Sequence, residues 1–158
     1  MGVKIMEFIE YNANPKKKKT SDCVVRAICT ALKERWEDTY KGLFEITLKK
    51  HYATNHKNTY EAYLKQKGYE KHKMPRRLDN TRYTVKEFAN ELAKPNKTYI
   101  ITIANHMTVL INNNLYDTWN CGNKSVCNYW VVDDKLYTQK ELQLLQESTP
   151  RKKHRVEL

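Results

Sequence analysis

Two side chains in this sequence have the chemistry and the setting of a nucleophile and its base. Cys23 falls in the first turn of an expected helix, directly after the capping candidates Thr20 and Ser21. Unpaired N–H groups and the helix dipole stabilise a thiolate there, and the thiolate is the form of cysteine that attacks carbonyl carbons. Cys29 lies about 240° further around the same helix, so we expect it to be a small core residue.

His106 is the histidine best placed to act as the base. It begins the apolar segment HMTVLI, which predicts a strand, whereas the other four histidines lie in lysine-rich polar stretches. A polar residue at the mouth of a strand can line a cleft, where one at its centre would only fill a core. A buried structural histidine stays the alternative until a partner for the ring is found.

The segment after His106 supplies two candidates for that partner. A three-residue turn over 112–114 would place Asn120 directly across from His106, whereas a turn of another length would bring Asp117 closer. Either side chain can accept a hydrogen bond from the imidazole and fix its tautomer, and Asp117 would also stabilise the imidazolium. Residues 117 and 120 point to opposite faces of a regular strand, so only one of them can serve.

The spacing of apolar residues, which predicts the helices and strands that position these side chains, changes along the chain. Apolar residues at helical spacing predict helices that begin near residues 21, 36, 59 and 84, the last opened by a capping box of Thr84 and Glu87. From residue 98 the period becomes that of strands in an antiparallel meander, after a short strand or arm near the N-terminus. The expected strands cover residues 98–103, 106–111, 115–119 and 126–132.

Helices followed by an antiparallel sheet predict an α+β fold. The length of 158 residues suits a single domain, which we expect over residues 1–150, with a basic tail over 151–158. A second capping box, at Thr138 and Glu141, predicts a C-terminal helix before that tail. We expect the tail to be dispensable for folding because it lacks apolar periodicity.

Composition and cysteine spacing narrow the class of protein. Apolar residues make up 40% of the chain and no stretch reaches the roughly 18 apolar residues of a membrane span, so we expect a cytoplasmic protein without a membrane segment. We see no secretory signal or lipidation motif. The four cysteines form two pairs, each six residues apart, which is not the spacing of a zinc knuckle. We expect no cofactor and no metal.

The formal charge of +11 favours an acidic partner, either a protein or a nucleic acid. No nucleic-acid-binding signature is present, so nucleic acid is the less favoured of the two. A lysine-rich surface that simply faces solvent is the plain alternative. The aromatic residues near His106 are read first as core and second as walls of a substrate cleft.

The order of these residues resembles papain-like cysteine peptidases, most of all the compact bacterial and phage proteins of the bacteriocin-processing type. Three patches carry the resemblance: residues 21–28 (SDCVVRAI), 105–109 (NHMTV) and 116–119 (YDTW). It implies a papain-like fold and thiol hydrolysis of a peptide or isopeptide bond in a protein substrate, with Cys23, His106 and Asp117 or Asn120 as the triad.

The chain departs from this family at the oxyanion hole. The family places a glutamine shortly before the cysteine, and here no glutamine precedes Gln66. Asn14 is the expected substitute, with Asn12 as the alternative, acting together with the backbone N–H of Cys23. The departure also raises a second hypothesis, a catalytically weak or inactive binding protein on the same fold, phage-encoded and directed against a host factor.

Overall fold

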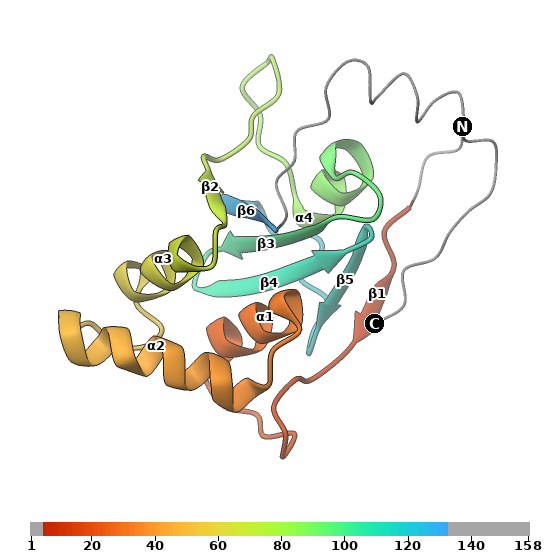
Figure 1. Cartoon of the computed structure of the whole chain (residues 1–158). Coiled ribbons are helices and arrows are strands. Elements are labelled where there is room, and N and C mark those ends of the chain that lie inside the picture. Colours follow the sequence, from red (N-terminus) through yellow and green to blue (C-terminus); the bar gives the residue numbers. More distant parts are fainter. Residues whose placement is uncertain (1–4, 133–158) are drawn as a thin grey trace.

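In the computed structural model, residues 5–132 are described, and residues 1–4 and 133–158 lie outside this part (Figure 1). The C-terminal helix predicted from Thr138 and the tail over 151–158 therefore lie outside the described residues. The described chain has the α+β class that the sequence predicted, with helices packed on a six-stranded sheet. Within residues 5–132, no helix is long and apolar enough to cross a membrane.

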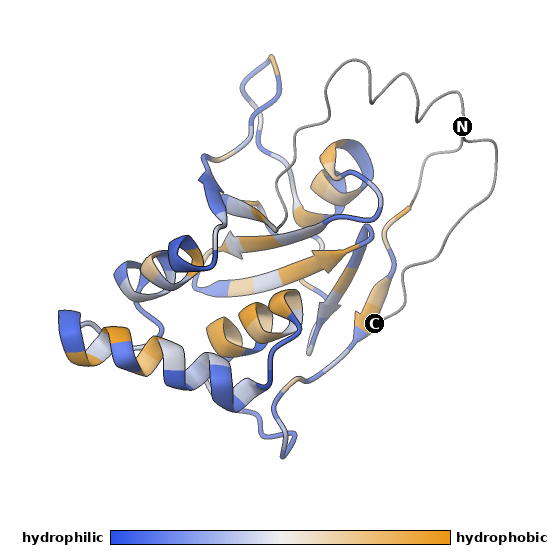
Figure 2. Ribbon diagram, viewed as in Figure 1, coloured by the Kyte–Doolittle hydropathy of each residue, from blue (hydrophilic) through white to orange (hydrophobic). Residues whose placement is uncertain are grey.

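Three helices form a layer on one face of the sheet: α1 (Cys23–Leu32), α2 (Trp36–Lys50) and α3 (Lys57–Gln66). The innermost of them, α1, is the most hydrophobic, as Figure 2 shows, and packs against the central strands. Its side chains meet Leu43 and Leu64 of the other two helices and Ile100, Met107 and Val109 of the sheet in one buried cluster. This packing fixes the start of α1, and with it Cys23, against the sheet.

The sheet has the strand order β1-β5-β4-β3-β6-β2. The predicted meander is present in its centre, where β3 (Thr98–Ile103), β4 (His106–Ile111) and β5 (Asn114–Asp117) pair antiparallel. β6 (Asn128–Val132) pairs with the far side of β3 and with the edge strand β2 (Glu70–His72), which the sequence did not predict. β1 (Phe8–Glu10) runs parallel to β5 and makes the sheet mixed.

The turn between β4 and β5 has two residues, so of the alternatives that the sequence left open the three-residue turn is not the one present. Asn112 and Asn113 both adopt positive φ, 51° and 66°, and Ile111 pairs directly with Asn114, the first residue of β5. Positive φ at both central residues is the geometry that matches the twist of a tight hairpin, and asparagine tolerates it. A turn of two residues shifts the register by one residue relative to a turn of three.

The opposite face of the sheet is covered by a short helix that changes its winding. The predicted capping box is present: the Thr84 hydroxyl accepts from the Glu87 N–H at 3.1 Å, and the Glu87 carboxylate accepts from the Thr84 N–H at 2.9 Å. Helix α4 (Val85–Glu87) then continues as a π-helical turn over Phe88–Leu92. The buried side chain of Asn113 donates to the carbonyls of Ala89 and Ala93, at 2.7 and 3.0 Å, and so ties the hairpin turn to this segment.

Candidate active site

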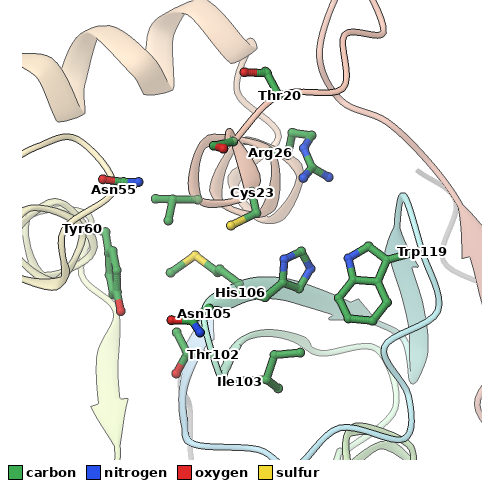
Figure 3. Close-up of a pocket in the computed structure, with 13 residues that line it drawn as sticks. Thr20, Cys23, Arg26, Asn55, Tyr60, Thr102, Ile103, Asn105, His106 and Trp119 are labelled. Carbon is green, nitrogen blue, oxygen red and sulfur yellow. The ribbon is translucent and has the colours of Figure 1, made fainter.

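Cys23 and His106 line one cavity of about 650 Å³ at the end of the sheet where β4 begins (Figure 3). Cys23 is the first residue of α1, and His106 is the first residue of β4, directly after the turn residue Asn105. Trp119 and Tyr60 stand on two sides of this cavity. The thiol and the imidazole predicted from the sequence therefore meet in a space large enough to admit a polypeptide segment.

Asp117 is the residue that holds the His106 ring. Its Oδ2 lies 2.7 Å from His106 Nε2, and both side chains are buried, with 3% and 10% of their surface exposed. Asn120 lies outside this contact, because it is exposed and its Oδ1 accepts from the Gly122 N–H at 3.0 Å. Of the two candidate partners, Asp117 is therefore the one that meets His106, because the two-residue turn sets the register that brings it there. If the pairing of β4 and β5 is continued past Asp117, a two-residue turn places residue 119 opposite His106. The centroid of the Trp119 ring lies 5.0 Å from that of the imidazole.

The Cys23 thiol is acidified by its surroundings. Burial by itself raises its pKa, but hydrogen bonds to the sulfur from the His106 ring and the Met107 backbone outweigh burial, and the charges of His106 and Arg26 add to them, so the pKa falls below its ordinary value. The contrast is Cys29, where burial raises the pKa to about 11 and leaves a protonated core thiol, as predicted. Among the four cysteines, which are all free, Cys23 is thus the one set up as a nucleophile.

His106 is held as an imidazolium by the groups around it. Burial by itself lowers its pKa, but hydrogen bonds to Asp117, Cys121 and Cys23 reverse that effect and raise the pKa to about 11. The carboxyl of Asp117 shows the complementary change: burial raises its pKa, and the bonds from His106 and Thr108 more than compensate and lower it. Asp117 occupies Nε2, which leaves Nδ1 as the ring nitrogen for Cys23. The arrangement favours a thiolate–imidazolium pair supported by a carboxylate.

A buried ion-pair network connects the helix to this carboxylate. Arg26 Nε donates to Asp22 Oδ1 at 2.7 Å, and Arg26 Nη1 donates to Asp117 Oδ1 at 3.4 Å. Asp22 is further bonded by the indole N–H of Trp36 at 3.0 Å. Sequence reasoning missed Arg26 and Asp22 as site residues. Their spacing of four on the first turn of α1 is a signal for a pair, but nothing in the sequence shows that Arg26 also reaches Asp117, 91 positions away.

Asn14 does not take the role that was expected of it. Its Nδ2 donates to Asp22 Oδ2 at 3.0 Å and its Oδ1 accepts from the Lys16 N–H at 2.9 Å, and it is not among the residues that line the cavity of Cys23. Asn12 likewise uses its side chain within the same loop, accepting from the Asn14 N–H at 2.9 Å. Neither amide stands where an oxyanion donor would be needed.

The start of α1 offers backbone donors in their place. Asp22 is the N-cap residue, but its carboxylate makes no capping hydrogen bond, since Asn14, Arg26 and Trp36 occupy it. The predicted caps Thr20 and Ser21 precede the helix, which begins at Cys23. The first N–H groups of a helix have no intrahelical acceptor and attract negative charge. The N–H groups at Cys23 and Val24 are therefore the natural donors to an oxyanion that forms beside the thiol.

Cys121 adds a thiol to the far side of the dyad. It is fully buried, and its Sγ lies 3.8 Å from Asp117 Oδ2. The donor atoms of His106, Asp117 and Cys121 all lie within 4.8 Å of one another, and nitrogen, carboxylate oxygen and thiolate sulfur together form a ligand set that suits zinc. A metal ion bound there would occupy Nε2 of His106 and break its contact with Asp117. No sequence spacing pointed to Cys121.

The aromatic residues near His106 divide between the two interpretations. Trp130 is buried in the core between the sheet and the helices, as favoured. Trp119 is 41% exposed and forms a wall of the cavity, which is the substrate-cleft interpretation. Comparisons of this chain with protein-family models, curated proteins and solved structures gave no match.

Proposed function

We propose that this chain is a papain-like thiol hydrolase that cleaves an amide bond, peptide or isopeptide, in a protein substrate. One observation carries the proposal: the His106 ring interacts with Cys23 on one side and is bonded to the buried Asp117 at 2.7 Å on the other, with Cys23 at an uncapped helix start. These are the positions that a nucleophile, a base and an orienting group need for acyl transfer.

In the acylation step, the Cys23 thiolate attacks the carbonyl carbon of the scissile amide. A C–S bond forms, and the π electrons of the carbonyl move to its oxygen, beside the N–H groups at the start of α1. The tetrahedral intermediate collapses as the His106 imidazolium gives its proton to the amide nitrogen. The C–N bond breaks, the amine leaves, and a thioester on Cys23 remains with a neutral imidazole beside it.

In the deacylation step, the neutral His106 takes a proton from a water molecule, whose oxygen attacks the thioester carbonyl. The C–S bond breaks and returns its electron pair to the sulfur, so the thiolate and the imidazolium are both restored. Asp117 stays ionised throughout and stabilises the imidazolium, because its own pKa is lowered by that contact.

The state of the cysteines fits a reducing compartment. All four are free, and the nucleophile is kept by preference as a thiolate, which an oxidising environment would consume. We therefore propose a cytoplasmic setting for this activity.

The proposal is tested by the rate of alkylation of each thiol with iodoacetamide at neutral pH, read by mass spectrometry. Cys127 is the internal control, because it is partly exposed like Cys23 and its sulfur accepts from Arg82 instead of an imidazole. We expect Cys23 to react at least tenfold faster than Cys127, and His106→Ala to remove most of the difference. A screen of protein substrates should then give cleavage that Cys23→Ala abolishes. Equal alkylation of the two thiols, or cleavage that survives Cys23→Ala, would contradict the proposal.

One observation favours a second candidate, the inactive binding protein. No side-chain amide of Asn12 or Asn14 stands beside Cys23, so the oxyanion site departs from the pattern of the family that the sequence resembles. On this alternative the pocket recognises a partner without turnover. A biological effect that is unchanged in Cys23→Ala, together with unchanged partner capture, would favour it.

A further inference from the structure

A second cavity, of about 830 Å³, lies beside the cavity of Cys23. Its lining comes from the end of β1, from the loop that joins β1 to α1, and from Arg26 and Thr118. Figure 1 shows the course of this loop. Three residues, Thr20, Ser21 and Arg26, line both cavities, so the two adjoin at the start of α1. We call this second cavity the lysine groove, because Lys17, Lys18 and Lys19 form one of its sides.

The loop that carries these lysines is held in one conformation by its own hydrogen bonds. The Asn14 side chain accepts from the Lys16 N–H at 2.9 Å, and the Asn14 carbonyl accepts from the Lys17 N–H at 2.9 Å. The Asn12 side chain donates to the Lys18 carbonyl at 3.3 Å, and Lys17 Nζ donates to the Asn12 carbonyl at 2.9 Å. The asparagines expected at the oxyanion hole therefore shape the side of the groove.

Within the described residues, no carboxylate neutralises the lysines of this groove. Within residues 5–132, no carboxylate lies within 4.0 Å of the ammonium groups of Lys16 to Lys19. Arg26 is committed to Asp22 and Asp117, and the single acidic residue that lines the groove is Glu10. Lysines fixed side by side repel one another, and an anionic ligand relieves that repulsion.

We propose that the lysine groove binds an acidic stretch of the polypeptide substrate and thereby delivers the adjoining amide bond to Cys23. This inference rests on the proposed function, because it names the substrate class of the same site. The groove adjoins a cavity whose thiol, on the proposed function, acts on acyl groups, and a nucleic acid offers no acyl carbon to attack. The adjacency of the two cavities therefore favours an acidic polypeptide over a nucleic acid.

The binding test uses Cys23→Ala protein, so that it does not depend on turnover. The probes are two fluorescein-labelled peptides of equal length, one with five glutamates and one with five glutamines at the same positions, measured by fluorescence anisotropy. We expect the acidic peptide to bind at least tenfold more tightly, with an affinity that falls as salt rises. The double variant Lys18→Ala with Lys19→Ala should weaken its binding by about two- to fivefold per lysine.

Two further variants test the role of charge: the first removes the same two positive charges elsewhere on the protein, and the second removes a negative charge from the groove. Lys49→Ala with Lys50→Ala removes two exposed lysines at the end of α2, outside the lining of either cavity, and should leave binding unchanged. Glu10→Gln removes the negative charge from the groove itself and should tighten binding of the acidic peptide. Equal affinity for both peptides, or equal losses in the two lysine double variants, would overturn the proposal. Tighter binding of a single-stranded oligonucleotide, lost in the groove variant alone, would overturn it in favour of nucleic acid.

A protection assay links the groove to the thiol. In the protein with Cys23 intact, the acidic peptide should slow alkylation of Cys23 by iodoacetamide, and Lys18→Ala with Lys19→Ala should remove this protection. Binding without protection of Cys23 would show that the groove does not lead to the site. Failure of the proposed function looks different, since Cys23 would then react no faster than Cys127 even without peptide.

Discussion

Replacing Asp117 by asparagine tests how much the negative charge of this carboxylate stabilises the His106 imidazolium. The substitution keeps the shape and leaves an amide oxygen for the hydrogen bond at Nε2, which now spans 2.7 Å between two buried side chains. His106 has a pKa raised from 6.5 to about 11, after burial has been overcome by Asp117, Cys121 and Cys23. Converted at about 1.36 kcal/mol per pKa unit, that shift corresponds to about 6 kcal/mol of stabilisation of the imidazolium, which is the combined effect of the three partners after the cost of burial.

Removing one partner of a buried ion pair typically costs about 3–5 kcal/mol, which is less than the combined stabilisation by all three partners. We therefore expect Asp117→Asn to lower the pKa of His106 by about two to four units. The pKa of Cys23 should rise at the same time, because the imidazolium that stabilises the thiolate then begins to lose its proton at or just above neutral pH. Any amide hydrolysis should fall by about four orders of magnitude, as in triads whose aspartate is replaced by asparagine.

The assay is the NMR titration of the His106 ring, since it requires no substrate, with Cys23 alkylation as a second readout. Asn120→Ala is the matched control, because Asn120 is exposed and bonded to Gly122 instead of the imidazole. We expect the His106 titration to be unchanged in that control. A His106 pKa that stays near its original value in Asp117→Asn would refute the reasoning, since the imidazolium would then be stabilised by something other than this carboxylate.

Three further predictions concern the thiols and the buried network. Hydrogen bonds lower the pKa of Cys23, whereas burial raises the pKa of Cys29 to about 11. Alkylation of Cys23 should therefore stay fast as the pH falls from 9 to 7, and Cys29 should react only in strong alkali. Similar pH profiles for the two thiols would contradict this. Arg26→Ala should reduce the free energy of unfolding in urea by about 3–5 kcal/mol, since it leaves the buried Asp22 carboxylate without its cation and leaves Asp117 with His106 alone. Arg35→Ala, which breaks an exposed pair with Asp38, should cost less than about 1 kcal/mol. Zinc bound at His106, Asp117 and Cys121 should slow alkylation of Cys23 reversibly, because it would bind the His106 ring that acidifies the thiol. Cys121→Ser should weaken this inhibition about tenfold or more, and undiminished inhibition in that variant would place the metal elsewhere.

The buried carboxylates of the network also determine how the stability of the fold changes at acid pH. Burial raises the pKa of Asp22, but the bonds from Asn14, Arg26 and Trp36 outweigh it and lower that pKa below 3.8. A carboxyl with a lowered pKa stabilises the fold above its unfolded pKa and loses that contribution as the pH falls through the folded value. The stabilisation from Asp22 and Asp117 is therefore complete at neutral pH and is lost below about pH 4.

Local patterns were enough to predict the helices and the central strands. Helix α1 is strongly amphipathic, and β3 and β4 are continuous apolar runs bounded by polar turns, so tertiary contacts had little to override. Strand β2 was missed because its sequence, Glu-Lys-His, is polar and only three residues long. Its assignment depends on pairing with β6, which the local sequence does not show.

The choice between Asp117 and Asn120 could not be made from the sequence, and the structure shows why. Three consecutive asparagines allow a turn of two or three residues with almost equal local preference. The amide of Asn113 bonds to the carbonyls of Ala89 and Ala93, more than 15 positions away, and thereby holds Asn113 in the turn. A contact between distant segments thus fixes the register, and the register determines which residue meets His106.

Asp22 shows how the same network serves the thiol. A carboxylate at the N-cap normally bonds the first N–H groups of its helix, and at this position it would place a negative charge directly before Cys23 and oppose its ionisation. Here Asn14, Arg26 and Trp36 hold the Asp22 carboxylate away from those N–H groups, and Arg26 neutralises it at 2.7 Å. The helix start therefore keeps its positive end for the thiolate and for an oxyanion beside it. Because Arg26 also bonds Asp117, one buried guanidinium connects the residues that acidify Cys23 with those that charge His106.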